Sequence, residues 1–251
     1  MLVGCAPNQR SGGVEAVGSQ QLDASPVAGT VLVTLPGAGA RTDTGGAGAA
    51  DTRRVGAERE VTVETLVEPV VARPATVAVV GDSLTQSAED EILASLTAAG
   101  LDVVTVDGLE SRRMTVGGSS LPPGTKAIES IRQRTEPGVW VIALGTNDVA
   151  SMGSANGFRT EMREVLALLP TDVPVVWVDL WIRDRESSIT EANEFIRQEL
   201  RTWRGGAAVV DWFSHGEDDG IITSDGIHLT GPGQQLFADS IAAAIDELFA
   251  P

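Results

Sequence analysis

The sequence predicts an α/β fold in which a five-stranded parallel sheet carries helices on both faces. Two observations support this prediction. Beyond Ala75, short apolar runs alternate with longer helix-like runs, and a polar or glycine-rich loop follows each short run. Five strand-then-helix units of this spacing favour a parallel sheet, because each helix returns the chain to the same end of the sheet. Functional side chains are then expected at the carboxyl ends of the strands.

The predicted strands are apolar runs rich in valine, and they occupy residues 76–80, 102–106, 139–144, 175–180 and 207–212. Four apolar, mostly β-branched residues at 77–80 are typical of a strand that is buried on both faces. The predicted helices occupy residues 88–99, 126–134, 157–169, 190–204 and 232–248. Ahead of these units, residues 61–71 alternate valine with polar residues and contain Pro69, so we expect an added edge strand there.

Length, composition and net charge limit the classes of protein to which this chain can belong. A length of 251 residues with 42% hydrophobic residues suits one α/β domain with an appendage. The net charge of −17, with 18 Lys plus Arg against 35 acidic residues, argues against nucleic acid as a partner. The apolar runs are too short to span a bilayer. We expect a monomer that needs no cofactor.

The N-terminal segment differs in composition from the rest of the chain. Leu2-Val3-Gly4-Cys5 resembles a bacterial lipobox, in which the cysteine is lipidated, although only Met1 precedes it. Residues 6–57 are rich in Gly, Ala, Ser, Thr and Pro and show no sustained period, so they predict a disordered linker. The expected organisation is therefore a lipobox remnant and linker at 1–57, a connector at 58–75 and a catalytic domain at 76–251. An anchor at Cys5 would be the contact with a membrane and would place the domain outside the cytoplasm; an untethered tail is the alternative.

Ser83 is the candidate nucleophile. It follows the first strand directly, at the start of a predicted helix whose unpaired N–H groups can stabilise an oxyanion. A serine nucleophile needs a base, and the chain contains two histidines, His215 and His228. Asp225 lies three residues before His228, a spacing that can place its carboxylate against the imidazole. These residues predict a triad in the chain order Ser83, Asp225, His228.

An oxyanion hole is expected from three loops. Asn147 follows the third strand and can direct an amide N–H at the developing charge, next to the backbone N–H of Ser83. A third donor is expected from the loop at 108–112. Structural readings compete with these roles, because Ser83 could be a helix N-cap and Asn147 could cap a turn.

Further residues near the strand ends have two interpretations each. Trp181 follows the fourth strand, where it could stack on a sugar ring or pack in the core. Arg112 and Arg113 could hold an anionic group of the substrate or form salt bridges. His215 is expected in a solvated loop. The remaining tryptophans expected in the core are Trp177, Trp203 and Trp212.

Three sequence blocks resemble those of the SGNH (GDSL) hydrolase superfamily. Gly-Asp-Ser-Leu at residues 81–84, Gly-Thr-Asn-Asp at 145–148 and Asp-Gly-Ile-His at 225–228 are similar to its first, third and fifth blocks. The resemblance covers residues 76–249. It implies a flavodoxin-like three-layer sandwich, no metal, and a Ser-His-Asp mechanism through an acyl-serine. The second block of the family supplies a glycine N–H to the oxyanion hole, and here that donor is either Gly108 or Ser111.

A narrower resemblance concerns residues 107–114, 145–147 and 209–212, which are similar to the extracellular SGNH domain of OatA-type peptidoglycan O-acetyltransferases. Three functions follow as hypotheses. The first is a serine esterase that removes small O-acyl groups, O-acetyl above all, from cell-wall glycans. The second is an acyltransferase that passes the acetyl group to a sugar hydroxyl. The third is a glycan-binding lipoprotein without turnover.

Overall fold

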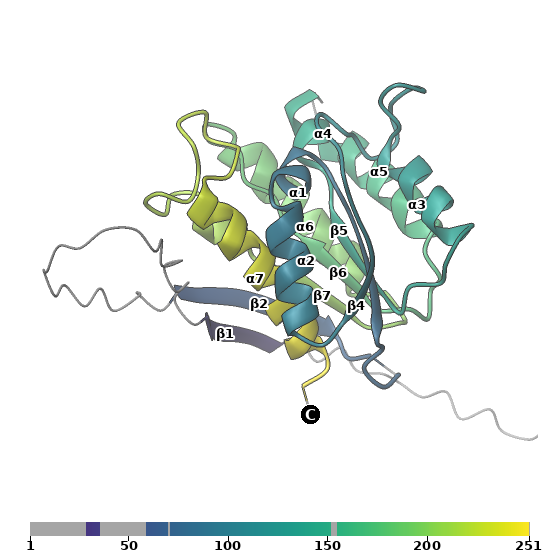
Figure 1. Ribbon diagram of the computed structural model, residues 1–251. Helices are drawn as coiled ribbons and strands as arrows, with labels where there is room; N and C mark the ends of the chain where they lie inside the picture. Colours follow the sequence, from purple (N-terminus) through teal and green to yellow (C-terminus); the bar gives the residue numbers. More distant parts are fainter. Residues whose placement is uncertain (1–28, 36–58, 70, 152–154, 251) are drawn as a thin grey trace, which may run out of the picture.

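A computed structural model describes residues 29–35, 59–69, 71–151 and 155–250. Figure 1 shows one sheet with helices packed on both sides. The strands are β1 (Gly29–Leu35), β2 (Arg59–Val67), β3 (Thr76–Gly81), β4 (Asp102–Gly108), β5 (Val139–Ala143), β6 (Val175–Val178) and β7 (Ala207–Val210). The helices are α1 (Ser83–Ser87), α2 (Glu89–Ala98), α3 (Gly124–Arg132), α4 (Thr146–Ser151), α5 (Ala155–Ala167), α6 (Glu186–Leu200), the 3₁₀ turn η1 (Phe213–His215) and α7 (Gly231–Leu248).

The five predicted strands form the parallel part of the sheet. The order of the described strands is β1-β2-β7-β6-β5-β3-β4, and β3 to β7 all pair in parallel. Within this part the first strand lies between the second and the third, which is the flavodoxin-like order. The direction of the crossovers reverses between β3 and β5. The carboxyl ends of these two strands therefore border the crevice where such sheets bind ligands.

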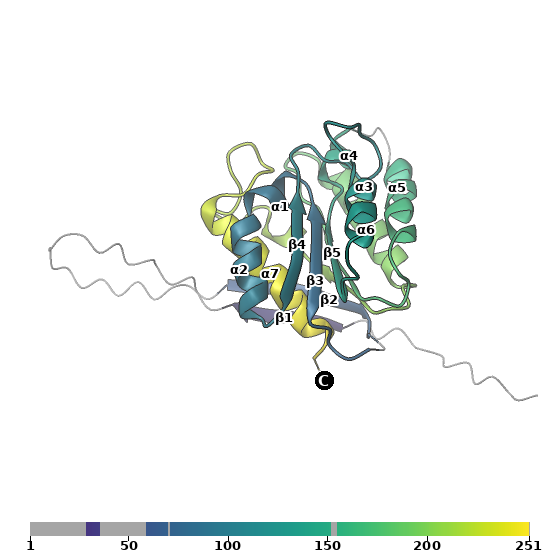
Figure 2. The same ribbon diagram turned by 45° about the vertical axis from the view of Figure 1, so that its right-hand side comes forward.

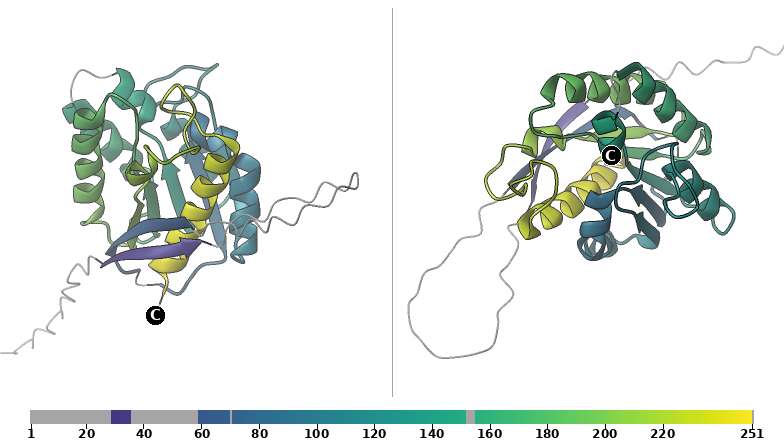
Figure 3. Two further views of the ribbon diagram at one scale, coloured as in Figure 1. Left: turned by 90° about the vertical axis from the view of Figure 1, so that its left-hand side faces the viewer. Right: turned by 90° about the horizontal axis from the view of Figure 1, so that it is seen from above.

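Two antiparallel strands extend the sheet beyond β7. β2 pairs antiparallel with β7, with Val63 opposite Val210, and β1 pairs antiparallel with β2, with Val31 opposite Val63. The edge strand expected at 61–71 therefore exists as β2, but it lies inside the sheet because β1 pairs with its outer edge. Figure 3 shows this hairpin against α7.

The predicted linker and domain boundary need correction. The segment Gly29–Leu35 was expected to be disordered within 1–57, and it forms β1 instead. The folded unit includes β1 and β2, so a domain that starts at residue 76 is too short. The other residues of the predicted linker, and the lipobox with Cys5, lie outside the described residues.

Alternation along each strand divides the core into two layers. Val77 and Val79 face α1, α2 and α7, whereas Ala78 and Val80 face α3, α5 and α6. Figure 2 shows these two groups of helices on opposite sides of β3, β4 and β5. Both faces are apolar, as expected for parallel strands covered by helices. The tryptophans predicted in the core are buried there, at Trp177, Trp203 and Trp212.

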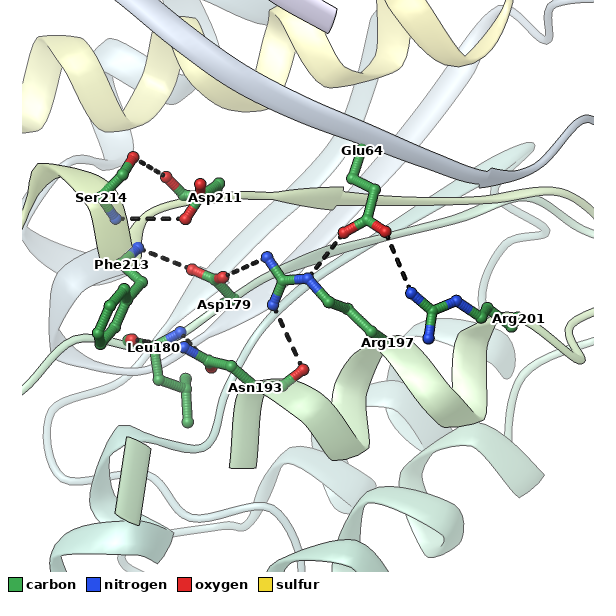
Figure 4. Close-up of polar contacts among 9 residues, drawn as sticks. All are labelled: Glu64, Asp179, Leu180, Asn193, Arg197, Arg201, Asp211, Phe213 and Ser214. Carbon is green, nitrogen blue, oxygen red and sulfur yellow. Dashed lines mark hydrogen bonds and ion pairs between the residues drawn. The ribbon is translucent and has the colours of Figure 1, made fainter. Parts of the chain in front are cut away.

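A polar network fastens the added hairpin to the parallel sheet (Figure 4). Glu64 of β2 accepts hydrogen bonds from Arg197 of α6 at 2.7 Å and from Arg201, the residue that caps the end of α6, at 3.3 Å. Arg197 also donates to Asp179 at 2.9 Å, directly after β6, and Asp179 accepts the Phe213 N–H at 2.8 Å. The network links β2, α6 and the segments that follow β6 and β7.

Candidate active site

Ser83 is the first residue of α1, at the end of β3. The Asp82 carboxylate caps this helix by accepting the Leu84 N–H at 3.1 Å, so Asp82 rather than Ser83 is the N-cap. Gly81 allows the close packing of this turn, because a Cβ there would lie 1.8 Å from Thr85 Oγ1. The local structure leaves the Ser83 hydroxyl available for another partner.

That partner is His228. Ser83 Oγ lies 3.1 Å from His228 Nε2, and His228 Nδ1 donates to Asp225 Oδ2 at 2.7 Å. The side chains of Asp225 and His228 are 50% and 48% exposed, so a substrate can approach them. The structure thus brings together the three residues predicted as a triad, with a separation of 145 positions between Ser83 and His228.

The turn that carries Asp225 and His228 is organised by the carboxylate. Asp225 Oδ1 accepts the backbone N–H groups of Ile227 at 2.9 Å and His228 at 3.0 Å, and the Thr223 hydroxyl at 2.7 Å. Partial burial alone would raise the pKa of Asp225, but the hydrogen bonds from His228, Ile227 and Thr223 outweigh it and hold the pKa below its ordinary value. The carboxylate therefore stays ionised opposite the imidazole.

Asn147 lies at the start of α4, directly after β5 and its loop. Its side-chain nitrogen donates to the Arg112 carbonyl at 3.1 Å and lies 3.5 Å from Asp82 Oδ2. Because β3 and β5 are neighbours, Asn147 and Ser83 occupy the same switch point of the sheet. The contact with the Arg112 carbonyl fixes the direction of the amide and uses one of its two N–H groups.

The two candidates for the third oxyanion donor differ in conformation. Gly108 is the last residue of β4, where a Cβ would lie 2.3 Å from the backbone nitrogen of Gln86. Ser111 lies in the following turn with φ of 59°, a conformation that glycine adopts more readily than serine. Within the described part of the chain the Ser111 N–H has no hydrogen-bond partner. The Ser111 N–H is therefore available to an external acceptor.

Comparison with known proteins places this site in a family. The model of the GDSL-like lipase/acylhydrolase family matches residues 79–236. The chain belongs to this family. The match spans more than half of the sequence and contains Ser83, Asn147, Asp225 and His228. Its members are acylhydrolases, and the chain is accordingly an SGNH/GDSL-type hydrolase. A comparison with curated proteins gave no significant match.

Solved structures share the fold of this acylhydrolase at low sequence identity. The catalytic domain of Streptococcus pneumoniae peptidoglycan O-acetyltransferase A matches with 18% identity and a TM-score of 0.54, covering 71% of this chain and 96% of that domain. TesA matches with 16% identity and a TM-score of 0.55, covering 69% and 99%. Esterase EstA of Pseudoalteromonas sp. matches with 13% identity and a TM-score of 0.52, covering 69% and 98%.

Two predicted substrate contacts do not agree with the structure of the acylhydrolase. The Arg112 side chain is 3% exposed, and its guanidinium donates to the Gly81 carbonyl at 3.1 Å and to Asp107 Oδ1 at 2.7 Å. Trp181 is 4% exposed and packs edge-to-face on Phe213, with ring centroids 5.4 Å apart. Arg112 therefore supports the loop after β4 and Trp181 is a core residue, so neither is placed to contact a substrate.

Two other polar residues have contacts that the sequence did not predict. His215 is 6% exposed rather than solvated, and its Nδ1 lies 2.7 Å from Asp218 Oδ2. Arg183, after β6, donates to the turn that carries Asp225. Its position after a strand is the one signal in the sequence that could have identified it. No cluster of three or more potential metal ligands occurs among the described residues, and none of the described helices is long and apolar enough to span a membrane.

Buried carboxyl groups lie close behind the site. Burial raises the pKa of Asp82 to about 6, against the opposing effect of the Leu84 N–H. Burial also raises the pKa of Asp148 to about 7, with a further contribution from Glu161. Asp148 accepts the Met114 N–H at 3.1 Å and holds the end of the loop that follows β4. Both carboxyls support the backbone around Ser83 and Asn147.

Proposed function

We propose that this chain is an extracytoplasmic serine esterase that removes small O-acyl groups, O-acetyl above all, from cell-wall glycans without a metal. The observation that supports it most is the chain of contacts from Ser83 Oγ to His228 Nε2 at 3.1 Å and from His228 Nδ1 to Asp225 at 2.7 Å. The contacts lie within the segment that matches the acylhydrolase family. A location outside the cytoplasm rests on the lipobox resemblance at Cys5, outside the described residues.

The first half-reaction forms the acyl-enzyme. His228 Nε2 takes the Ser83 hydroxyl proton while Oγ attacks the ester carbonyl, and Asp225 stabilises the resulting imidazolium. The oxyanion receives N–H groups from Ser83, Ser111 and the Asn147 side chain, each such donor being worth about 3 kcal/mol in a transition state. His228 then gives its proton to the leaving sugar alkoxide.

The second half-reaction releases the acyl group. His228 Nε2 takes a proton from water, the water oxygen bonds to the acyl carbon, and the Ser83 Oγ–acyl bond breaks as the proton returns to Oγ. A sugar hydroxyl in place of water would make the protein an acyltransferase. The exposure of His228 and Asp225 supports this acyltransferase as the second candidate function, because an acceptor glycan could reach both side chains.

The direct test is the intact mass of the protein after mixing with an acetyl ester. We expect an acetyl adduct in the wild type and none in Ser83→Ala, because the adduct is an ester of Ser83. Adding a peptidoglycan oligosaccharide then distinguishes the reactions: free acetate identifies an esterase, and acetylated sugar identifies a transferase. Absence of both adduct and turnover with short-chain esters would contradict the proposed function and favour a binding protein.

A further inference from the structure

The turn formed by residues 223–228 carries two members of the proposed triad on an exposed segment of the surface. Its own backbone is closed by hydrogen bonds from the Thr223 N–H to the His228 carbonyl at 2.8 Å and from the Gly226 N–H to the Thr223 carbonyl at 3.0 Å. These bonds fix the shape of the turn. They do not fix where the turn lies relative to Ser83.

Two residues outside the adjoining segment connect this turn to the rest of the described chain by hydrogen bonds. One is Ser83, through its hydroxyl and His228 Nε2. The other is Arg183, whose backbone N–H donates to the Gly226 carbonyl at 3.1 Å and whose Nη1 donates to the Ser224 carbonyl at 3.0 Å. Arg183 thus binds the turn on both sides of Asp225.

The packing of Gly226 shows how closely Arg183 follows the turn. Gly226 has φ of 80°, and a Cβ there would lie 2.4 Å from Arg183 Cβ and 3.2 Å from its Cδ. The aliphatic part of Arg183 therefore lies along the glycine while the guanidinium reaches the Ser224 carbonyl. A shorter side chain could keep the backbone contact but not the guanidinium contact.

The two connections are not equivalent during the reaction. In the acyl-enzyme, Ser83 Oγ is the ester oxygen and no longer has a proton to donate to His228. Among the described residues outside the adjoining segment, Arg183 then remains as the hydrogen-bonded connection of the turn. Deacylation requires His228 Nε2 to take a proton from water at this stage, and a misplacement of about 1 Å can cost roughly 100-fold in rate.

We propose that Arg183 is a positioning residue that holds the His228 turn in place while Ser83 is acylated. This inference rests on the proposed function. Arg185 offers a matched control: it is an exposed arginine of the same loop, and within the described chain its side chain has no hydrogen bond or ion pair. The variants are Arg183→Ala, Arg183→Lys and Arg185→Ala.

The kinetic experiment measures formation and decay of the acetyl-enzyme separately by intact mass. In Arg183→Ala we expect deacylation to slow by roughly tenfold and acylation by less, because Ser83 still holds His228 during acylation. The acetyl-enzyme should accumulate. Arg183→Lys should recover part of the rate, and Arg185→Ala should behave as the wild type. Equal slowing of both steps, or identical behaviour of the two alanine variants, would overturn the proposal.

A second measurement does not depend on turnover. In Ser83→Ala the connection through Ser83 is removed, and the Nδ1 proton of His228, bonded to Asp225, can be followed by NMR. We expect Ser83→Ala/Arg183→Ala to lose this signal through exchange with water, while the Nδ1 proton of His215, bonded to Asp218, persists. Retention of both signals would overturn the proposal. If the wild type forms no acetyl-enzyme, the proposed function fails, and this measurement alone decides the role of Arg183.

Discussion

At the scale of single residues, the role of Asp225 gives the sharpest prediction. Asp225→Asn should lower kcat by roughly 10³- to 10⁴-fold, because an amide cannot hold the imidazole in the tautomer that accepts the Ser83 proton. The rate of ester hydrolysis at saturating substrate concentration measures this loss of kcat. Asp218→Asn is the matched control, since Asp218 pairs with His215 at the same distance of 2.7 Å outside the candidate site. A similar loss in both variants would contradict the assignment.

Asp179 makes stability depend on pH. Burial raises its pKa to about 7, against the attraction of Arg197, whereas an unfolded aspartate titrates near pH 4. The folded state therefore binds more protons between about pH 4 and 7, and the free energy of unfolding falls as pH rises through this window. Urea denaturation across the window should show a smaller fall in Asp179→Asn. An unchanged pH dependence in this variant would contradict the prediction.

The sequence predicted correctly that Ser83, Asp225 and His228 are neighbours, because each follows a strand of a parallel sheet and so reaches the same edge. The sequence did not predict that Arg112 and Arg113 would have different contacts. One guanidinium is buried against the Gly81 carbonyl and the other contacts Asp148, a difference set by the path of the loop after β4. The left-handed conformation of Ser111 was equally inaccessible, since serine does not signal it.

At the scale of elements, the contact between β2 and α6 depends on one carboxylate. Glu64→Ala removes the shared partner of Arg197 and Arg201 and leaves Asp179 to hold Arg197 alone. We expect a loss of about 2 kcal/mol in the free energy of unfolding, because the group is mostly but not fully buried. Urea denaturation measures it. Glu60→Ala, an exposed position on the same strand, should change stability little; equal losses would argue against the network.

β1 shows why one element escaped prediction. Its sequence alternates, with Val31 and Val33 on the partly buried side and Leu32 exposed, but it lies within a Gly- and Ala-rich stretch whose composition indicates disorder. What orders it is pairing with β2, about thirty residues further along, and β2 in turn depends on β7, almost 150 residues beyond. Such distant pairings leave little trace in local patterns.

At the scale of the whole molecule, the hairpin β1–β2 belongs to the folding unit. Val61, Val63 and Leu66 are fully buried in the two core layers, and burial of each contributes about 1.5–3 kcal/mol. Domains of this kind are stable by only about 5–15 kcal/mol. Loss of these three side chains alone therefore removes most of that margin, and removal of β2 also exposes the edge of β7.

We accordingly expect a chain that starts at Ala72 to unfold at a much lower temperature than the full chain, or to aggregate through the exposed β7 edge. A chain that starts at Gly29 keeps both strands and should melt as the full chain does. Thermal unfolding followed by circular dichroism, together with limited proteolysis, compares the full chain with the chains that start at Gly29 and Ala72. Cooperative unfolding of the Ala72 chain at the temperature of the full chain would contradict the prediction, and would mean that the parallel sheet and its helices are stable without the hairpin.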